Sequence, residues 1–72
     1  MVKLYTKDNC VKCRLTRMKL VEQDIDFEEH SIDHEAGIAD MLREQGFQSA
    51  PVVITDNDAW SGFRPNKIEE LA

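Results

Sequence analysis

The stretch Cys10-Val11-Lys12-Cys13 contains the only two cysteines of this 72-residue chain. An apolar run, Val2-Lys3-Leu4-Tyr5-Thr6, precedes it and predicts a buried first strand. An amphipathic helical pattern follows it over residues 10–23. A Cys-x-x-Cys placed where a strand passes into a helix can cycle between dithiol and disulfide. The stretch therefore predicts a thiol–disulfide exchange site.

A zinc site is the other chemistry that the cysteine pair allows. Sixteen residues separate Cys13 from His30-x3-His34, a spacing that resembles a zinc finger. The gap is longer than the usual ~12–15 residues, and the cysteines begin a helix rather than a hairpin. We therefore expect surface histidines, a redox site that needs no metal or cofactor, and a small zinc-binding module only as a remote alternative.

Length and composition indicate one small domain over residues 1–72. Hydrophobic residues make up 42% and charged residues 32% of the chain, which is ordinary for a globular protein. No apolar run approaches the ~20 residues of a membrane span, and residues 1–5 are too short and too polar for a signal peptide. We therefore expect a cytoplasmic protein, in a compartment where disulfides are more often catalytic than structural.

Charge divides the chain into a basic and an acidic part. Residues 1–21 carry six basic side chains and one acid, whereas residues 22–72 carry three basic side chains and thirteen acids. Cations around the cysteines would favour a thiolate and attract an acidic partner, although a solvated helix face is an equal explanation. The net charge of −5 argues against nucleic acid as a partner.

The first helix pattern also predicts which cysteine reacts. We expect Asn9 to cap the helix. Unpaired N–H groups and the helix dipole at this end would lower the pKa of Cys10 below the free value of ~8.5, with help from Lys7 and Lys12. Cys10 is therefore the predicted nucleophile, and Cys13, one turn deeper, resolves the mixed disulfide. The apolar stripe of this helix is predicted to be Val11, Leu15, Met18 and Val21, broadened by Leu20.

The rest of the chain predicts three strands and two helices. Strands are expected at residues 25–32, 52–54 and from 59, and helices at residues 34–45 and from 65. The polar strand 25–32 suits a sheet edge, and Asp33 and Gly46 are expected to cap the second helix. An α/β fold follows, with a four-stranded mixed sheet flanked by three helices in the order β-α-β-α-β-β-α.

Two downstream motifs relate the chain to a known family. Ala50-Pro51 precedes the third strand, and Trp60-Ser61-Gly62-Phe63-Arg64-Pro65 begins in the fourth. With the cysteines and the element order, they resemble the thioredoxin superfamily and its short glutaredoxin branch. The Cys10–Cys13 stretch looks like the Cys-Val-Gln-Cys of the NrdH-redoxins, and the Trp60–Pro65 run matches their characteristic sequence. Lys12 and Asn66 depart from this pattern, since Gln and an acid are common there.

The resemblance implies a glutaredoxin-like fold with thioredoxin-like behaviour. In the superfamily the matching proline is cis and lies beside the active cysteines, and the residue before it hydrogen-bonds the substrate peptide through its backbone. These roles carry over to Pro51 and Ala50. The family is reduced by thioredoxin reductase and donates electrons to the class Ib ribonucleotide reductase, so these two are the expected partners of a monomer.

The resemblance leaves the role of the Trp60–Pro65 run open. The run replaces the Gly-Gly-x-Asp-Asp sequence that helps glutaredoxins hold glutathione, which agrees with a protein rather than glutathione as the electron donor. A glutathione-dependent glutaredoxin is the alternative function. Trp60 and Phe63 either pack in the core or form an apolar docking surface beside Cys10. Arg64 either pairs with a partner acid or fixes the loop internally. The predicted partner-binding residues are Val11, Lys12, Ala50, Pro51, Trp60, Ser61, Gly62, Phe63 and Arg64.

Overall fold

Four strands form one mixed sheet in the order β2-β1-β3-β4, in a computed structural model that describes all residues from 1 to 72. Strands β1 and β2 are parallel, and the pairs β1–β3 and β3–β4 are antiparallel. The elements are β1 (Val2–Thr6), α1 (Val11–Glu22), β2 (Phe27–Ser31), α2 (Ile38–Glu44), β3 (Val52–Ile54), β4 (Ala59–Ser61) and α3 (Pro65–Glu70). The predicted fold class and element order are confirmed, and the polar strand β2 lies at the expected edge.

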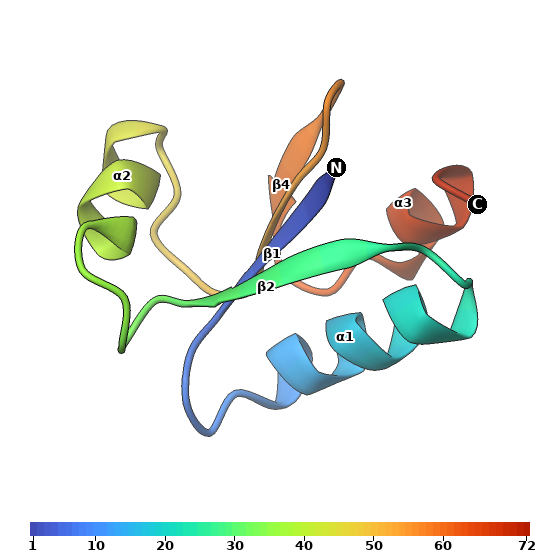
Figure 1. Cartoon of the computed structure of the whole chain (residues 1–72), viewed down its shortest axis with the longest axis horizontal. Helices are drawn as coiled ribbons and strands as arrows, with labels where there is room; N and C mark the ends of the chain where they lie inside the picture. Colours follow the sequence, from blue (N-terminus) through green and yellow to red (C-terminus); the bar gives the residue numbers. More distant parts are fainter.

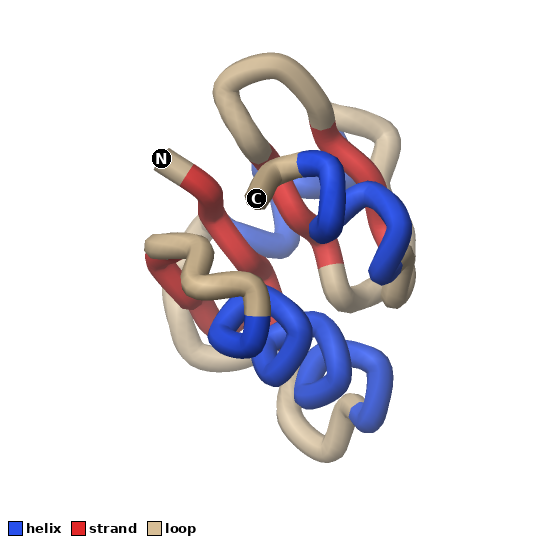
Figure 2. The backbone as a smooth tube through the Cα atoms, turned by 90° about the vertical axis from the view of Figure 1, so that its right-hand side faces the viewer, coloured by secondary structure: helices blue, strands red, loops and turns tan.

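Helices cover both faces of this sheet (Figure 1). Leu4 of β1 packs with residues of α1 and α3 in one core cluster, whereas the adjacent Tyr5 packs with Leu42 of α2 in a second cluster. This division follows from the alternation of side chains along a strand. Both chain ends lie at the end of the molecule away from the β1–α1 loop (Figures 1 and 2). No helix has the length and apolar character needed to cross a membrane.

Helix α1 turns a different face to the core than its apolar spacing predicts. Its buried residues are Cys13, Thr16 and Leu20. The predicted stripe is exposed instead, with exposed fractions of 59% for Val11, 40% for Leu15, 59% for Met18 and 64% for Val21. Thr16 is tolerated inside because its hydroxyl donates to the Lys12 carbonyl at 2.8 Å. The prediction was wrong because two stripes on this helix have the same spacing. The stripe that faces the core contains a threonine and a cysteine, so it looks less apolar in the sequence.

The helix starts also differ from the predicted caps. Cys10, not Asn9, is the N-cap of α1. Helix α2 begins at Ile38 rather than near residue 34, after Gly37 in a left-handed conformation. Asp33 is therefore not its cap; its carboxylate instead accepts the Asp8 N–H at 2.9 Å. The predicted stop at Gly46 is confirmed, since Gly46 has φ 91° and the next residue donates its N–H back to the Leu42 carbonyl.

An ion pair joins α1 to strand β2. Arg17 Nε donates to Glu29 Oε1 at 2.6 Å, and its Nη2 lies 2.5 Å from Oε2. The Thr6 hydroxyl at the end of β1 also donates to Oε2 at 3.1 Å. The hydrogen bonds from Arg17, with the smaller one from Thr6, hold the pKa of Glu29 below its ordinary value against the opposing effect of burial. The folded protein therefore favours the ionised carboxylate.

Glu29→Gln should lower the free energy of unfolding at pH 7 by up to about 1 kcal/mol, because the pair is only partly shielded from water. Since the pKa of Glu29 is lower in the folded than in the unfolded state, the carboxylate stabilises the protein above its unfolded pKa. This contribution disappears as the pH falls through the folded pKa, from about pH 4 downward. Urea unfolding between pH 7 and pH 3 should show the variant and wild type converging at acid pH. A constant difference would contradict this.

Candidate active site

The two cysteines lie at the first turn of α1. Cys10 has an extended backbone, and its Sγ accepts the Cys13 N–H at 3.1 Å. The sulfurs are joined as a disulfide with the Cα atoms 5.2 Å apart, which is within the usual range. Cys10 is half-buried, whereas Cys13 is only 1% exposed. Cys10 is therefore the more accessible of the two cysteines.

The sheet register brings the cis-proline segment and the Trp60 run to this end of the molecule. Tyr5 of β1 pairs with Val52 of β3, so the segment before β3 lies where β1 leads into the cysteine loop. Val52 also pairs with Ser61, and the Gly62 N–H donates to the Pro51 carbonyl at 2.8 Å. The Ala50–Pro51 peptide bond is cis, as the resemblance implied. Residues from three distant parts of the sequence thus meet at one end of the sheet.

Positive charge surrounds the cysteines. Lys7, Arg14 and Arg17 line a surface hollow that includes both cysteines, and Asp8 is the one acid that also lines it. Cations at this position favour a thiolate electrostatically. The two arginines belong to the basic part of the chain, residues 1–21, from which the sequence predicts this charge, and Arg14 is one helical turn from Cys10. Lys12 is exposed and does not line the hollow.

The Trp60 run does not form an exposed aromatic surface. Trp60 is 4% exposed and belongs to the core cluster, so of the two roles that the sequence left open, the structure shows core packing. Phe63 is half-buried and packs against the same cluster. Arg64 Nε donates to the Ser61 carbonyl at 3.3 Å, which fixes the loop internally. The run meets the cis-proline segment through the backbone of Gly62, whose N–H donates to the Pro51 carbonyl.

The histidines do not join the cysteines. His30 Nδ1 lies 2.9 Å from Glu35 Oε1, and its ring stacks on Tyr5. His34 Nε2 lies 2.7 Å from Asp8 Oδ2. No group of three or more His, Cys, Asp or Glu side chains is placed to hold a metal ion. The zinc-finger spacing in the sequence is therefore not assembled in space.

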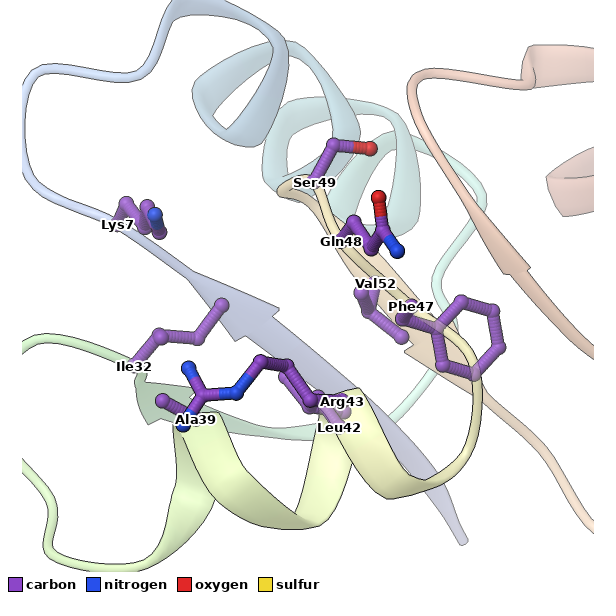
Figure 3. A pocket seen from close by; sticks show the side chains of 9 residues that line it. All are labelled: Lys7, Ile32, Ala39, Leu42, Arg43, Phe47, Gln48, Ser49 and Val52. Atoms are coloured by element: carbon purple, nitrogen blue, oxygen red, sulfur yellow. The ribbon is translucent and has the colours of Figure 1, made fainter.

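A second hollow, which the sequence did not indicate, lies between α2 and the segment leading to Pro51 (Figure 3). Its volume is about 130 Å³. Leu42, Phe47 and Val52 supply apolar walls, and Lys7 and Arg43 bring positive charge to it (Figure 3). Arg43 is paired with Asp40, so Lys7 is the cation of this hollow that has no ion-pair partner.

Fold and site together define a thiol–disulfide oxidoreductase with a thioredoxin-like fold. A family model for glutaredoxin matches residues 2–60. A glutaredoxin-like protein NrdH from Lactococcus lactis is 40% identical over 72 residues, which cover 100% of both chains. The chain belongs to the glutaredoxin family, in its NrdH-redoxin branch.

Solved structures agree with this assignment. NrdH-redoxin from Escherichia coli superposes with a TM-score of 0.95 at 39% identity, covering 99% of this chain and 93% of that one. It is described as a glutaredoxin-like protein with a thioredoxin-like activity profile. A glutaredoxin from Archaeoglobus fulgidus superposes with a TM-score of 0.80 at 29% identity, covering 97% and 83% of the two chains.

Trp60→Ala should remove about 3–5 kcal/mol of stability, a large part of the total for a domain of this size. Trp60→Phe should cost much less, because it keeps an aromatic ring in the core and removes an indole N–H that is buried without a partner. Urea unfolding of both variants measures the difference. Equal losses of stability in the two variants would contradict the prediction that an aromatic ring without the indole N–H is better tolerated in the core.

In the reduced protein, the Cys10 thiol should have a pKa below the free value of about 8.5, because the helix N–H groups and nearby cations stabilise its anion. The rate of alkylation by iodoacetamide as a function of pH, followed by mass spectrometry in Cys13→Ser, measures this pKa. The matched control is Cys10→Ser, in which the buried Cys13 should react slowly. A midpoint at or above 8.5 for Cys10 would contradict the electrostatic argument.

Proposed function

We propose that this protein is a cytoplasmic dithiol electron carrier, reduced by thioredoxin reductase and donating electrons to the class Ib ribonucleotide reductase. The observation that carries the proposal is the reachable Cys10 beside the buried Cys13 in an NrdH-type chain. The thioredoxin-like activity profile of the E. coli relative supports a reductase rather than glutathione as donor. A reducing compartment would keep such a pair available for catalysis.

The geometry suits a two-step exchange. The Cys10 thiolate attacks one sulfur of the acceptor disulfide, which breaks that bond, forms a mixed disulfide and releases one acceptor thiolate. Cys13 then loses its proton and attacks the Cys10 Sγ, which releases the second acceptor thiolate. The two released thiolates take up the proton that Cys13 lost and one proton from water, which balances the proton that Cys10 lost when it ionised. The net result is the transfer of two electrons and two protons, leaving the acceptor as a dithiol and this protein as the Cys10–Cys13 disulfide.

The backbone of Ala50 is available for an acceptor peptide. Neither its N–H nor its C=O has a hydrogen-bond partner within the chain. An extended peptide laid along this segment would satisfy both groups, as in other cases of strand addition. We therefore propose that the segment Ala50–Pro51 positions the acceptor disulfide in front of Cys10. Val11 and Lys12, both exposed, complete the proposed contact surface.

Glutathione is the second candidate donor. The hollow beside α2 favours it, because the positive charge of Lys7 and Arg43 suits a peptide carboxylate (Figure 3). Arg43, however, is already paired with Asp40. The chain also lacks the Gly-Gly-x-Asp-Asp sequence by which glutaredoxins hold this tripeptide. We therefore place glutathione second.

The donor can be identified by reduction of the disulfide form. NADPH with thioredoxin reductase should reduce the protein with steady turnover, whereas glutathione with glutathione reductase should be at least about tenfold slower at equal disulfide concentration. Oxidation of NADPH, read at 340 nm, follows both reactions. Turnover with the glutathione system but not with thioredoxin reductase would reverse the donor assignment.

A Cys13→Ser variant separates the two cysteine roles. It should lose turnover but accumulate a mixed disulfide between Cys10 and the ribonucleotide reductase, because no second thiol can release the partner. Non-reducing gel electrophoresis detects this adduct. Cys10→Ser is the matched control and should form none. Equal adducts through either cysteine would contradict the assignment of Cys10 as nucleophile.

A further inference from the structure

The outer face of α1 is unusually apolar. Four of the five large hydrophobic side chains that are exposed in this protein belong to this helix, and the fifth is Met1. Single exposed hydrophobic residues are normal, but a contiguous group indicates an interaction site. We define the α1 stripe as the exposed residues Val11, Leu15, Met18 and Val21.

The α1 stripe is continuous with the redox site. At about 100° per residue, Val11, Leu15 and Met18 fall within about 60° of one another on the helix surface, opposite Thr16 and Leu20 of the core face. Val11 lies between the two cysteines, and the stripe extends from there for about 15 Å along the helix. Any protein whose disulfide reaches Cys10 must therefore lie close to the start of this stripe.

Unpaired cations flank the stripe at its cysteine end. Helical spacing places Lys12 on one side and Arg14 on the other. Both are exposed, and neither takes part in an ion pair. Arg17 and Lys19, farther along the helix, are already held by acids of this chain. Of the charges on α1 itself, those still available beside the start of the stripe are therefore positive and complement an acidic partner.

We propose that the α1 stripe is a docking surface for the protein acceptor of electrons, and that this acceptor presents apolar side chains flanked by Asp or Glu next to its disulfide. The inference rests on the proposed function and specifies which acceptors it favours. A second copy of this chain is a poor occupant, because it would cover Val11 and obstruct Cys10. The net charge of −5 also makes two copies repel one another.

The test compares the reduction of three disulfides by the reduced protein. Two are synthetic helical peptides that carry the same Cys-x-x-Cys disulfide followed by leucines, one flanked by glutamates and the other by lysines. The third is hydroxyethyl disulfide, which is small and uncharged. We expect the acidic peptide to react about tenfold faster than the basic one at low salt, with a difference that shrinks as salt screens the charges.

Leu15→Gln with Met18→Gln removes apolar surface while keeping good helix formers. Its rate with the acidic peptide, divided by its rate with hydroxyethyl disulfide, should fall about three- to tenfold below that of wild type. The matched control, Leu15→Met with Met18→Leu, keeps both positions apolar and should retain the wild-type ratio. Circular dichroism and thermal midpoints confirm that all three proteins are folded.

Three outcomes would count against the inference. An equal ratio in the wild type and the glutamine variant would overturn it and leave the redox function intact. A dimer seen by light scattering, and lost in the glutamine variant, would assign the stripe to a second copy and also overturn it. Failure of the reduced wild type to act on any of the three disulfides would overturn the proposed function itself.

Discussion

Burial of Leu20 in the cluster with Leu4, Val53 and Ile68 is the packing contact on which the rest of the molecule depends. It fixes the rotation of α1 against the sheet. With Leu20 turned inward, Cys13 is also turned inward, since the two residues lie two helical turns apart on one face. Cys10, at the helix start, then remains at the surface. The unequal exposure of the two sulfurs therefore results from core packing, rather than from any difference between the residues.

The same rotation decides what the protein offers to others. Once Thr16 and Leu20 face the core, the more apolar side of α1 must face water. A domain this small has few ways to bury hydrophobic surface, and this chain leaves a notable part of it beside the redox pair. The Trp60 run does the opposite: Trp60 is buried in the core, and the backbone of Gly62 bonds the cis-proline segment. The apolar side chains of α1, which the sequence predicts to be buried, are exposed, whereas Trp60, a candidate for partner contact, is buried.

Most of the fold could be predicted from local patterns. The apolar runs at residues 2–6 and 52–54 marked two strands, Pro65 marked the last helix, and Gly46 marked the end of α2, because each of these effects acts within a few residues. The start of α2 was misplaced because Asp33 is a good cap by type, yet its carboxylate is taken by the distant backbone of Asp8. The buried face of α1 was misjudged because helical spacing identifies an apolar stripe but does not show which face of the helix packs against the sheet.

The sequence by itself determined the chemistry of this protein: a Cys-x-x-Cys at a helix start has its dithiol character wherever the helix lies, because the reacting atoms are three residues apart. The sequence from Trp60 to Pro65, which resembles that of the NrdH-redoxins, also indicated the family without coordinates. The tertiary structure alone decided which surface surrounds Cys10. The registers that join Tyr5 to Val52 and Val52 to Ser61 are long-range pairings, and the rotation of α1 depends on side chains contributed by four other elements. Such contacts are cooperative, so no single segment encodes them.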